Sequence, residues 1–233
     1  MDWLTLSPDE AAAVRLSLRV ATVSTLASLP PALLIAFLLA RRRFPGHALL
    51  NGLVHLPLVM PPVVTGYLLL LAFGRRGPVG AFLADHLGLV LSFRWTGAAL
   101  ASAVMSFPLV VRAIRLSVEA VDRRLEAAAA TLGAPPLLVF LTVTLPLVAP
   151  GLLAGAILGF AKSMGEFGAT ITFVSNIPGE TQTLPSAIYA LTQVPGGEAG
   201  ALRLTLVSIA ISMAALLASE AIATRLARRL AAA

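Results

Sequence analysis

The chain has 233 residues, of which 58% are hydrophobic and only 12% are charged, and its formal net charge is +6. Soluble domains carry about 25% charged residues, so the composition excludes a disordered chain and argues against a soluble globular domain. The absence of cysteine excludes disulfides, Cys-ligated zinc and thiol chemistry. We expect one membrane-embedded domain over residues 1–233, with no room for a second soluble domain.

Apolar runs without charged residues mark the candidate membrane spans, because a spanning helix needs about 20 mostly apolar residues. They predict five spans, at about 16–40, 48–73, 96–117, 137–161 and 201–224. The stretch 162–200 is rich in Gly, Pro, Asn and Thr, which predicts a non-spanning or re-entrant segment; the alternative is a sixth span within Gly165–Leu191. Val79–Phe93 is interrupted by Asp85 and His86 and is expected to lie at the membrane interface.

Prolines within the predicted spans indicate helix kinks at Pro61, Pro146 and Pro150, because proline removes a backbone donor and clashes with the preceding turn. The kinks can serve packing alone or a transport pathway. The tetrapeptide Leu-Pro-Leu-Val occurs at both 56–59 and 145–148, and the ungapped alignment pairs Pro61 with Pro150. This similarity is either chance or the sign of two helices kinked at the same depth.

Basic residues in short loops predict the orientation in the membrane. With the N-terminus outside and five spans, 10 of the 17 lysines and arginines fall on the cytoplasmic side, including the run 41–43. The reverse orientation places only the other seven there. We therefore expect an external N-terminus and a cytoplasmic C-terminus.

No pattern for catalysis, metal binding or cofactor binding is visible. The histidines, His47, His55 and His86, lack ligand spacing, and neither a G-x-S-x-G nor an H-E-x-x-H motif occurs. Lys162 and Glu166 lie four residues apart, which favours a neutralising pair on one helix face over a role in handling substrate. Transport against a gradient would then draw its energy from another chain or from an ion.

The predicted cytoplasmic loop, about residues 118–136, contains a short amphipathic helix. Asp122 is a suitable N-cap, the alanines that follow favour helix, and Gly133 with the prolines at 135–136 ends it. One apolar stripe recurs at i, i+3, i+4 and i+7: Leu125, Ala128, Ala129 and Leu132. Its small side chains favour docking in a groove of a partner protein over lying on the membrane surface.

This loop resembles the cytoplasmic signature of the permease subunits of bacterial ABC importers, which reads E-A-A, three residues, G, nine residues, I-x-L-P. Gly133 is followed by nine residues and then by Val143-Thr144-Leu145-Pro146. The glutamate position of the signature is occupied by Ala127, and a glutamate stands one place earlier, at Glu126. The resemblance implies that the loop is the coupling helix that docks on the ATP-hydrolysing subunit. The implied contact residues are Leu125, Glu126, Ala128, Ala129, Leu132 and Gly133.

Two further stretches, Leu58–Gly80 and Met164–Glu198, are similar to tetrahedral-oxyanion permeases, closest to those for molybdate and next to those for sulfate. In the second stretch, glycines allow close approach, and neutral hydrogen-bonding groups suit a dianion in transit. The candidate pathway or gate residues are Gly165, Glu166, Gly168, Thr170, Thr172 and Asn176.

The resemblance implies an all-α integral membrane protein, a bundle of about five helices, or six, with a cytoplasmic coupling helix. It implies a molybdate permease of the bacterial inner membrane whose pathway lies at a homodimer interface. The implied partners are a second copy, two ATP-binding cassette subunits that bind ATP and Mg, a periplasmic oxyanion-binding protein and the lipid bilayer, with no nucleic acid. The chain itself would be no enzyme and would hold no cofactor. The alternatives are a sulfate/thiosulfate or tungstate permease, an ion-coupled transporter, and an integral membrane enzyme.

Overall fold

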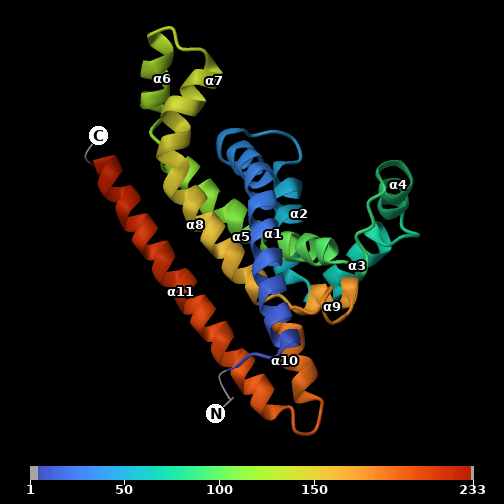
Figure 1. Ribbon diagram of the computed structural model, residues 1–233. Coiled ribbons are helices and arrows are strands. Elements are labelled where there is room, and N and C mark those ends of the chain that lie inside the picture. The colour runs from blue at the N-terminus through green and yellow to red at the C-terminus, as the bar shows by residue number, and fades with distance from the viewer. Residues whose placement is uncertain (1–4, 232–233) are drawn as a thin grey trace.

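The computed structural model describes residues 5–231, and the regular elements within that range are all helices (Figure 1). This confirms the all-α class. In chain order the elements are α1 (Pro8–Arg41), α2 (His47–Val59), α3 (Pro62–Phe73), α4 (Pro78–Leu87), α5 (Trp95–Ala120), α6 (Arg123–Thr131), α7 (Pro136–Val139), the π-helical turn η1 (Phe140–Thr144), α8 (Leu145–Met164), α9 (Gly168–Val174), α10 (Leu184–Thr192) and α11 (Glu198–Ala231).

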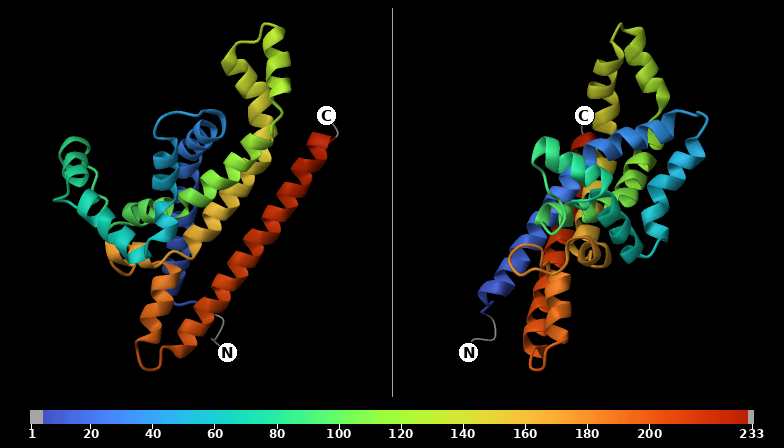
Figure 2. Two further views of the ribbon diagram at one scale, coloured as in Figure 1. Left: turned by 180° about the vertical axis from the view of Figure 1, so that it is seen from behind. Right: turned by 90° about the vertical axis from the view of Figure 1, so that its right-hand side faces the viewer.

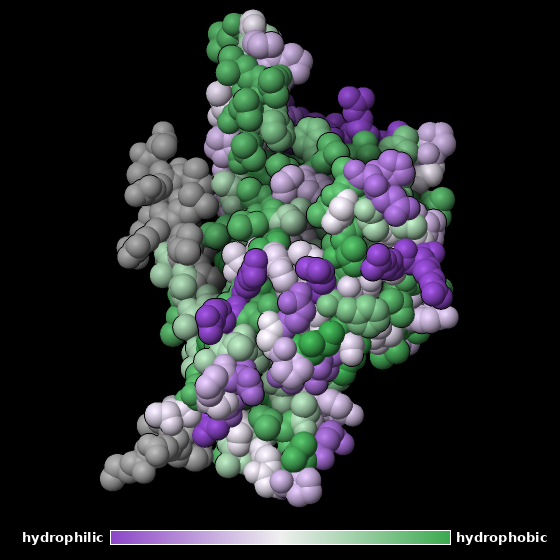
Figure 3. Space-filling view, turned by 45° about the vertical axis from the view of Figure 1, so that its right-hand side comes forward, coloured by the Kyte–Doolittle hydropathy of each residue, from purple (hydrophilic) through white to green (hydrophobic). Residues whose placement is uncertain are grey.

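Four described helical segments are long and apolar enough to cross a membrane: Pro8–Arg41, Trp95–Ala120, Pro136–Met164 and Glu198–Ala218. They correspond to the predicted spans at 16–40, 96–117, 137–161 and 201–224. The helix pair α2 and α3 adds a fifth if the two count as one bent span. Figure 3 shows mostly hydrophobic residues over one face of the molecule, with the hydrophilic ones in separate patches.

The prediction of one kinked helix over 48–73 is wrong, because α2 and α3 meet at an angle of 116°. A residue that precedes proline is pushed out of the helical region by the proline ring. Met60 precedes Pro61, and Pro61 precedes Pro62, so two successive residues take extended backbone, with ψ of 146° and 134°. The chain therefore turns at Pro61 instead of kinking.

The predicted fourth span is one helical unit that contains both Pro146 and Pro150. The turn before Pro146 is π-helical, and the Leu145 N–H donates to the Phe140 carbonyl. Such bulges are one way in which a helix accommodates a local disturbance. Helix α8 continues through Pro150. The aligned Pro61 and Pro150 thus have different local structures, so of the two interpretations of the repeat, the one with two helices kinked alike is wrong.

Helices α1, α5 and α8 pack against one another and form the centre of the molecule. Three glycines one turn apart line the face of α8 that meets α5: a Cβ at Gly151 would collide with Ser117, and a Cβ at Gly155 or Gly159 would press on Val110. Small residues at this spacing let helix backbones approach closely, which is a main source of stability between helices in lipid.

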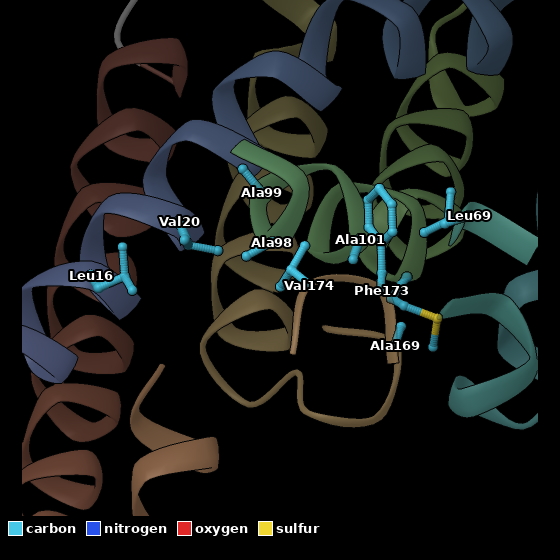
Figure 4. Packing of buried hydrophobic residues seen from close by; sticks show 10 residues of the cluster. Leu16, Val20, Leu69, Ala98, Ala99, Ala101, Ala169, Phe173 and Val174 are labelled. Carbon is cyan, nitrogen blue, oxygen red and sulfur yellow. The ribbon is translucent and has the colours of Figure 1, made fainter. Parts of the chain in front are cut away.

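A second packing centre joins α1 and α5 to the short helix α9 (Figure 4). The cluster contains Leu16 and Val20 of α1, the alanines at 98–101 of α5, and Phe173 and Val174 of α9, both fully buried. The apolar interior therefore extends from the long helices to a segment that is too short to span a membrane.

The stretch 162–200 forms α9, of seven residues, and α10, of nine, joined by an irregular loop. This agrees with a non-spanning segment, and the alternative of a sixth span within Gly165–Leu191 is wrong. The glycines, the prolines and Thr183 divide the stretch into pieces shorter than a span. Helix α4, of ten residues, is likewise too short to span, which is compatible with the expected interfacial position of Val79–Phe93.

Candidate functional site

Helices α6 and α7 form a hairpin that protrudes from one end of the molecule, past the end of α1 (Figures 1 and 2). The Asp122 carboxylate accepts a hydrogen bond from the Arg124 N–H at 2.9 Å, which confirms the predicted N-cap. Gly133 has φ of +85°, in the left-handed region that favours glycine, and Pro136 begins the next helix. The loop therefore folds as a short, firmly ended helix joined to the membrane-spanning unit 136–164.

The predicted apolar stripe of this helix is largely uncovered. Leu125 is 49% exposed and Leu132, which directly follows α6, is 89% exposed. Ala128 is exposed too, whereas Ala129 is half-buried, and α6 contains no buried residue. Large apolar side chains left open to solvent are typical of a surface that another protein covers.

Glu126 connects α6 to two other elements. Its Oε1 lies 3.0 Å from Nη2 of Arg41, the last residue of α1, and accepts a hydrogen bond from the Thr144 hydroxyl at 2.7 Å. The sequence analysis missed Arg41 and Thr144 as partners of this glutamate. The one signal was the displacement of Glu126 by one place from the signature, which rotates it by about 100° around the helix.

The second candidate group lies around α9. Glu166, only 2% exposed, pairs with Lys162 at 2.7 Å and accepts the Ala169 N–H at 3.1 Å. The predicted neutralising pair therefore forms, and the same carboxylate satisfies a free N–H in the first turn of α9. Gly165 is exposed where α8 ends, and no atom comes closer than 4.0 Å to its added Cβ.

Three other gate candidates differ in what their polar atoms do. The Thr172 hydroxyl donates to the Gly168 carbonyl of its own helix at 2.8 Å. The Thr170 hydroxyl and Asn176 Oδ1 are buried and have no hydrogen-bond partner among the described residues. The structure thus brings the candidates into one segment but does not turn them toward one open surface.

Gly168 and Gly66 mark a close contact between α9 and α3. A Cβ on Gly168 would lie 2.8 Å from the Pro62 Cβ, and one on Gly66 would lie 2.5 Å from the Ala169 carbonyl oxygen. Thr65, beside Gly66, is buried, and its hydroxyl has no hydrogen-bond partner in the part of the chain that the structure describes. The sequence analysis did not select Thr65 or Gly66, although both lie in the permease-like stretch 58–80. Two short helices from distant parts of the chain therefore meet with almost no space between their backbones.

The histidines make local contacts only. A ring nitrogen of each lies near a backbone carbonyl oxygen: Leu39 for His47, Asn51 for His55 and Phe82 for His86, at 2.8–3.1 Å. Among the side chains that the structure describes, no three of His, Cys, Asp or Glu come together in a group that could hold a metal ion.

Comparisons with known proteins agree with this geometry. Residues 32–231 match the family described as "Binding-protein-dependent transport system inner membrane component". The chain is 60% identical to the molybdenum transport system permease protein ModB of Escherichia coli K12, over 92% of this chain and 94% of that protein. It is 57% identical to ModB of Haemophilus influenzae, over 95% and 96%.

Solved structures give the same fold. A bacterial ABC transporter that imports alginate superposes with a TM-score of 0.74 at 15% identity, covering 95% of this chain and 81% of that one. The inward-facing methionine transporter MetNI superposes with a TM-score of 0.69 at 16% identity, covering 92% and 94%. With a family match over most of its length and relatives of 57–60% identity, the chain belongs to the inner membrane components of binding-protein-dependent transport systems, the membrane-spanning permeases of ABC importers.

Proposed function

We propose that the chain is the subunit through which molybdate crosses the inner membrane, driven by ATP hydrolysis in a separate protein. The observation that carries this proposal is the 60% identity to a molybdenum transport permease over 92% of the chain. An identity near 40% would not distinguish molybdate from sulfate as the transported anion. A sulfate transport permease of Salmonella typhimurium is 38% identical over 80% of the chain, and more distant molybdenum permeases are 40% identical. Sulfate is therefore the second candidate, and tungstate the third.

The coupling role belongs to α6. The exposed side chains of Leu125, Ala128 and Leu132, in and directly after the helix, would enter a groove of the ATP-binding cassette subunit, together with Ala129 and Gly133. Glu126 would hold the helix in place through its pair with Arg41. Because α6 is followed within five residues by the rigid unit 136–164, movement of the ATPase would shift that helix and not be absorbed by a loop. ATP and Mg would be bound by the partner.

The orientation proposed is N-terminus outside and C-terminus inside, with α6 in the cytoplasm. It is supported by the arginines that gather at the α6 end of the molecule, where Arg41, Arg115 and Arg123 line one cavity. Two copies would enclose the pathway, and a periplasmic oxyanion-binding protein would deliver the anion to the opposite end. The α3–α9 contact is our candidate for the part of the wall that rearranges when the anion passes. It contains the buried hydroxyls of Thr65 and Thr170, which have no hydrogen-bond partner among the described side chains.

The test is complementation of an Escherichia coli strain that lacks its own molybdenum permease. Expression of the chain should restore saturable uptake of labelled molybdate, and a hundredfold excess of sulfate should leave most of it. If sulfate competes as strongly as unlabelled molybdate, the cargo is sulfate. If no uptake returns although the protein reaches the membrane and binds the ATPase, molybdate transport is refuted.

A further inference from the structure

A basic cavity lies at the α6 end of the molecule, outside the candidate coupling surface and the α3–α9 contact. It has a volume of about 730 Å³ and is bounded by the end of α1, the turn that follows, the start of α2, the last turns of α5 and the start of α6. This volume lies within the range of about 300–1,000 Å³ that is usual for small-molecule sites. Five arginines line it together with one glutamate: Arg41, Arg42, Arg43, Arg115, Arg123 and Glu119.

Arg41 is the deepest of these cations. Its side chain is only 9% exposed, and its single ion pair uses one Nη2 contact to Glu126 at 3.0 Å. Its Nε is fully buried and has no hydrogen-bond partner among the described residues. A buried donor without an acceptor is unfavourable in the free protein.

The other arginines leave a surplus of positive charge. Arg115 is held by Glu119 at 2.8 Å and by the Asn51 side chain at 3.1 Å, which fixes it at the wall. Arg42, Arg43 and Arg123 form no ion pair with any side chain that the structure describes. Of the five lining arginines, two are therefore paired with a carboxylate and three are not.

The remaining wall is partly apolar. Leu39, Ala40 and Phe44 border the arginines, and Ala40 is the last apolar residue of the long hydrophobic run of α1. The cavity thus lies where the apolar part of a span gives way to charge, which is the depth of lipid headgroups.

We propose that this cavity binds a phosphate-type tetrahedral oxyanion. The planar fork of arginine matches such an anion bidentately, and several guanidinium groups around one cavity favour a dianionic phosphate over a single carboxylate. Two sources supply this chemistry: the phosphates of an anionic phospholipid, or a free oxyanion in the cytoplasm. The apolar wall suits the phospholipid, and the experiment separates the two.

The experiment uses the full chain purified in detergent as the assembled transporter. One arm counts bound cardiolipin by native mass spectrometry, with phosphatidylcholine as the uncharged reference. The other arm measures binding of labelled inorganic phosphate by equilibrium dialysis. The variant Arg42→Gln/Arg43→Gln removes two exposed, unpaired arginines, and the matched control Arg75→Gln/Arg76→Gln removes two adjacent exposed arginines between α3 and α4. Arg123→Gln, on the rim contributed by α6, gives an independent single change.

The expected result is saturable binding of one ligand in one arm, at least tenfold weaker in Arg42→Gln/Arg43→Gln, weaker in Arg123→Gln, and unchanged within twofold in the control. The responding arm identifies the source. Absence of saturable binding in both arms overturns the proposal, as does an equal loss in the control, because binding would then follow net charge alone. A loss of ATPase co-purification without anion binding assigns the arginines to the subunit interface and also overturns it.

Discussion

Replacing Glu126 by alanine should release helix α6 from its side-chain contacts with α1 and η1. Alanine preserves helix propensity in a segment that already contains Ala127–Ala130, so the change removes only the side-chain contacts. Both contacts end at one oxygen: the ion pair with Arg41 at 3.0 Å and the hydrogen bond from Thr144 at 2.7 Å. Since α6 has no fully buried residue, little hydrophobic burial within the chain replaces them.

The magnitude follows from the burial of the pair. Removing one partner of a fully buried ion pair costs about 3–5 kcal/mol, and a hydrogen bond to a charged group is worth about 1.5–3 kcal/mol. The Glu126 side chain is 23% exposed while that of Arg41 is 9% exposed, so we take about 2–3 kcal/mol. At about 1.4 kcal/mol for each factor of ten, the opening equilibrium of α6 rises roughly 30- to 150-fold.

Hydrogen exchange measures this directly. A detached helix of nine residues is too short to remain folded in water, so its amides should exchange faster by the same factor, while those of α5 keep their rates. Glu119→Ala is the matched control, because its pair with Arg115 is an i, i+4 contact with the glutamate 41% exposed. Such pairs are worth about 0.3–0.5 kcal/mol, so the amide exchange rates in Glu119→Ala should change less than threefold. If the amide exchange rates of α6 in Glu126→Ala stay within threefold of those in the unmodified protein, the Glu126 contacts do not hold the helix.

Two other changes test the remaining contacts. Gly66→Ala places a Cβ 2.5 Å from the Ala169 carbonyl oxygen, so it should lower the stability of the purified protein by about 1–3 kcal/mol in thermal unfolding. Gly52→Ala is the control, because no atom lies within 4 Å of the added Cβ. Equal unfolding midpoints for the two variants would disprove tight α3–α9 packing. Leu132→Asp changes a side chain that is 89% exposed, so the protein should still fold while ATPase co-purification falls at least tenfold. Leu89→Asp, in the loop after α4, is the control. Unchanged ATPase binding in Leu132→Asp would place the docking surface elsewhere.

Much of this molecule follows from local features of its sequence. Apolar runs of about 20 residues have one low-energy form in lipid, a hydrogen-bonded helix, and four of the five predicted spans are such helices. The ends of α6 were predictable too, because an aspartate cap and a glycine followed by prolines act within one turn of the backbone. The same holds for the Lys162–Glu166 pair, whose members are neighbours on one helix face.

The tertiary structure decided what depends on contacts across the chain. Pro61 and Pro150 share a sequence context, and the proline after Pro61 accounts locally for the turn there, but the packing of that turn against α9, through Pro62 and Gly168, is a tertiary contact. Glu126, predicted as a residue of the coupling surface, contacts Arg41, 85 residues away in the chain, and Thr144, 18 residues away. The periodicity within α6 cannot predict contacts with such distant residues. The contact at Gly66 and the arginine cavity likewise join segments far apart in the chain. Helix formation is a local equilibrium, whereas close packing and charge pairing are set by which helix faces meet, and that information resides in the whole fold.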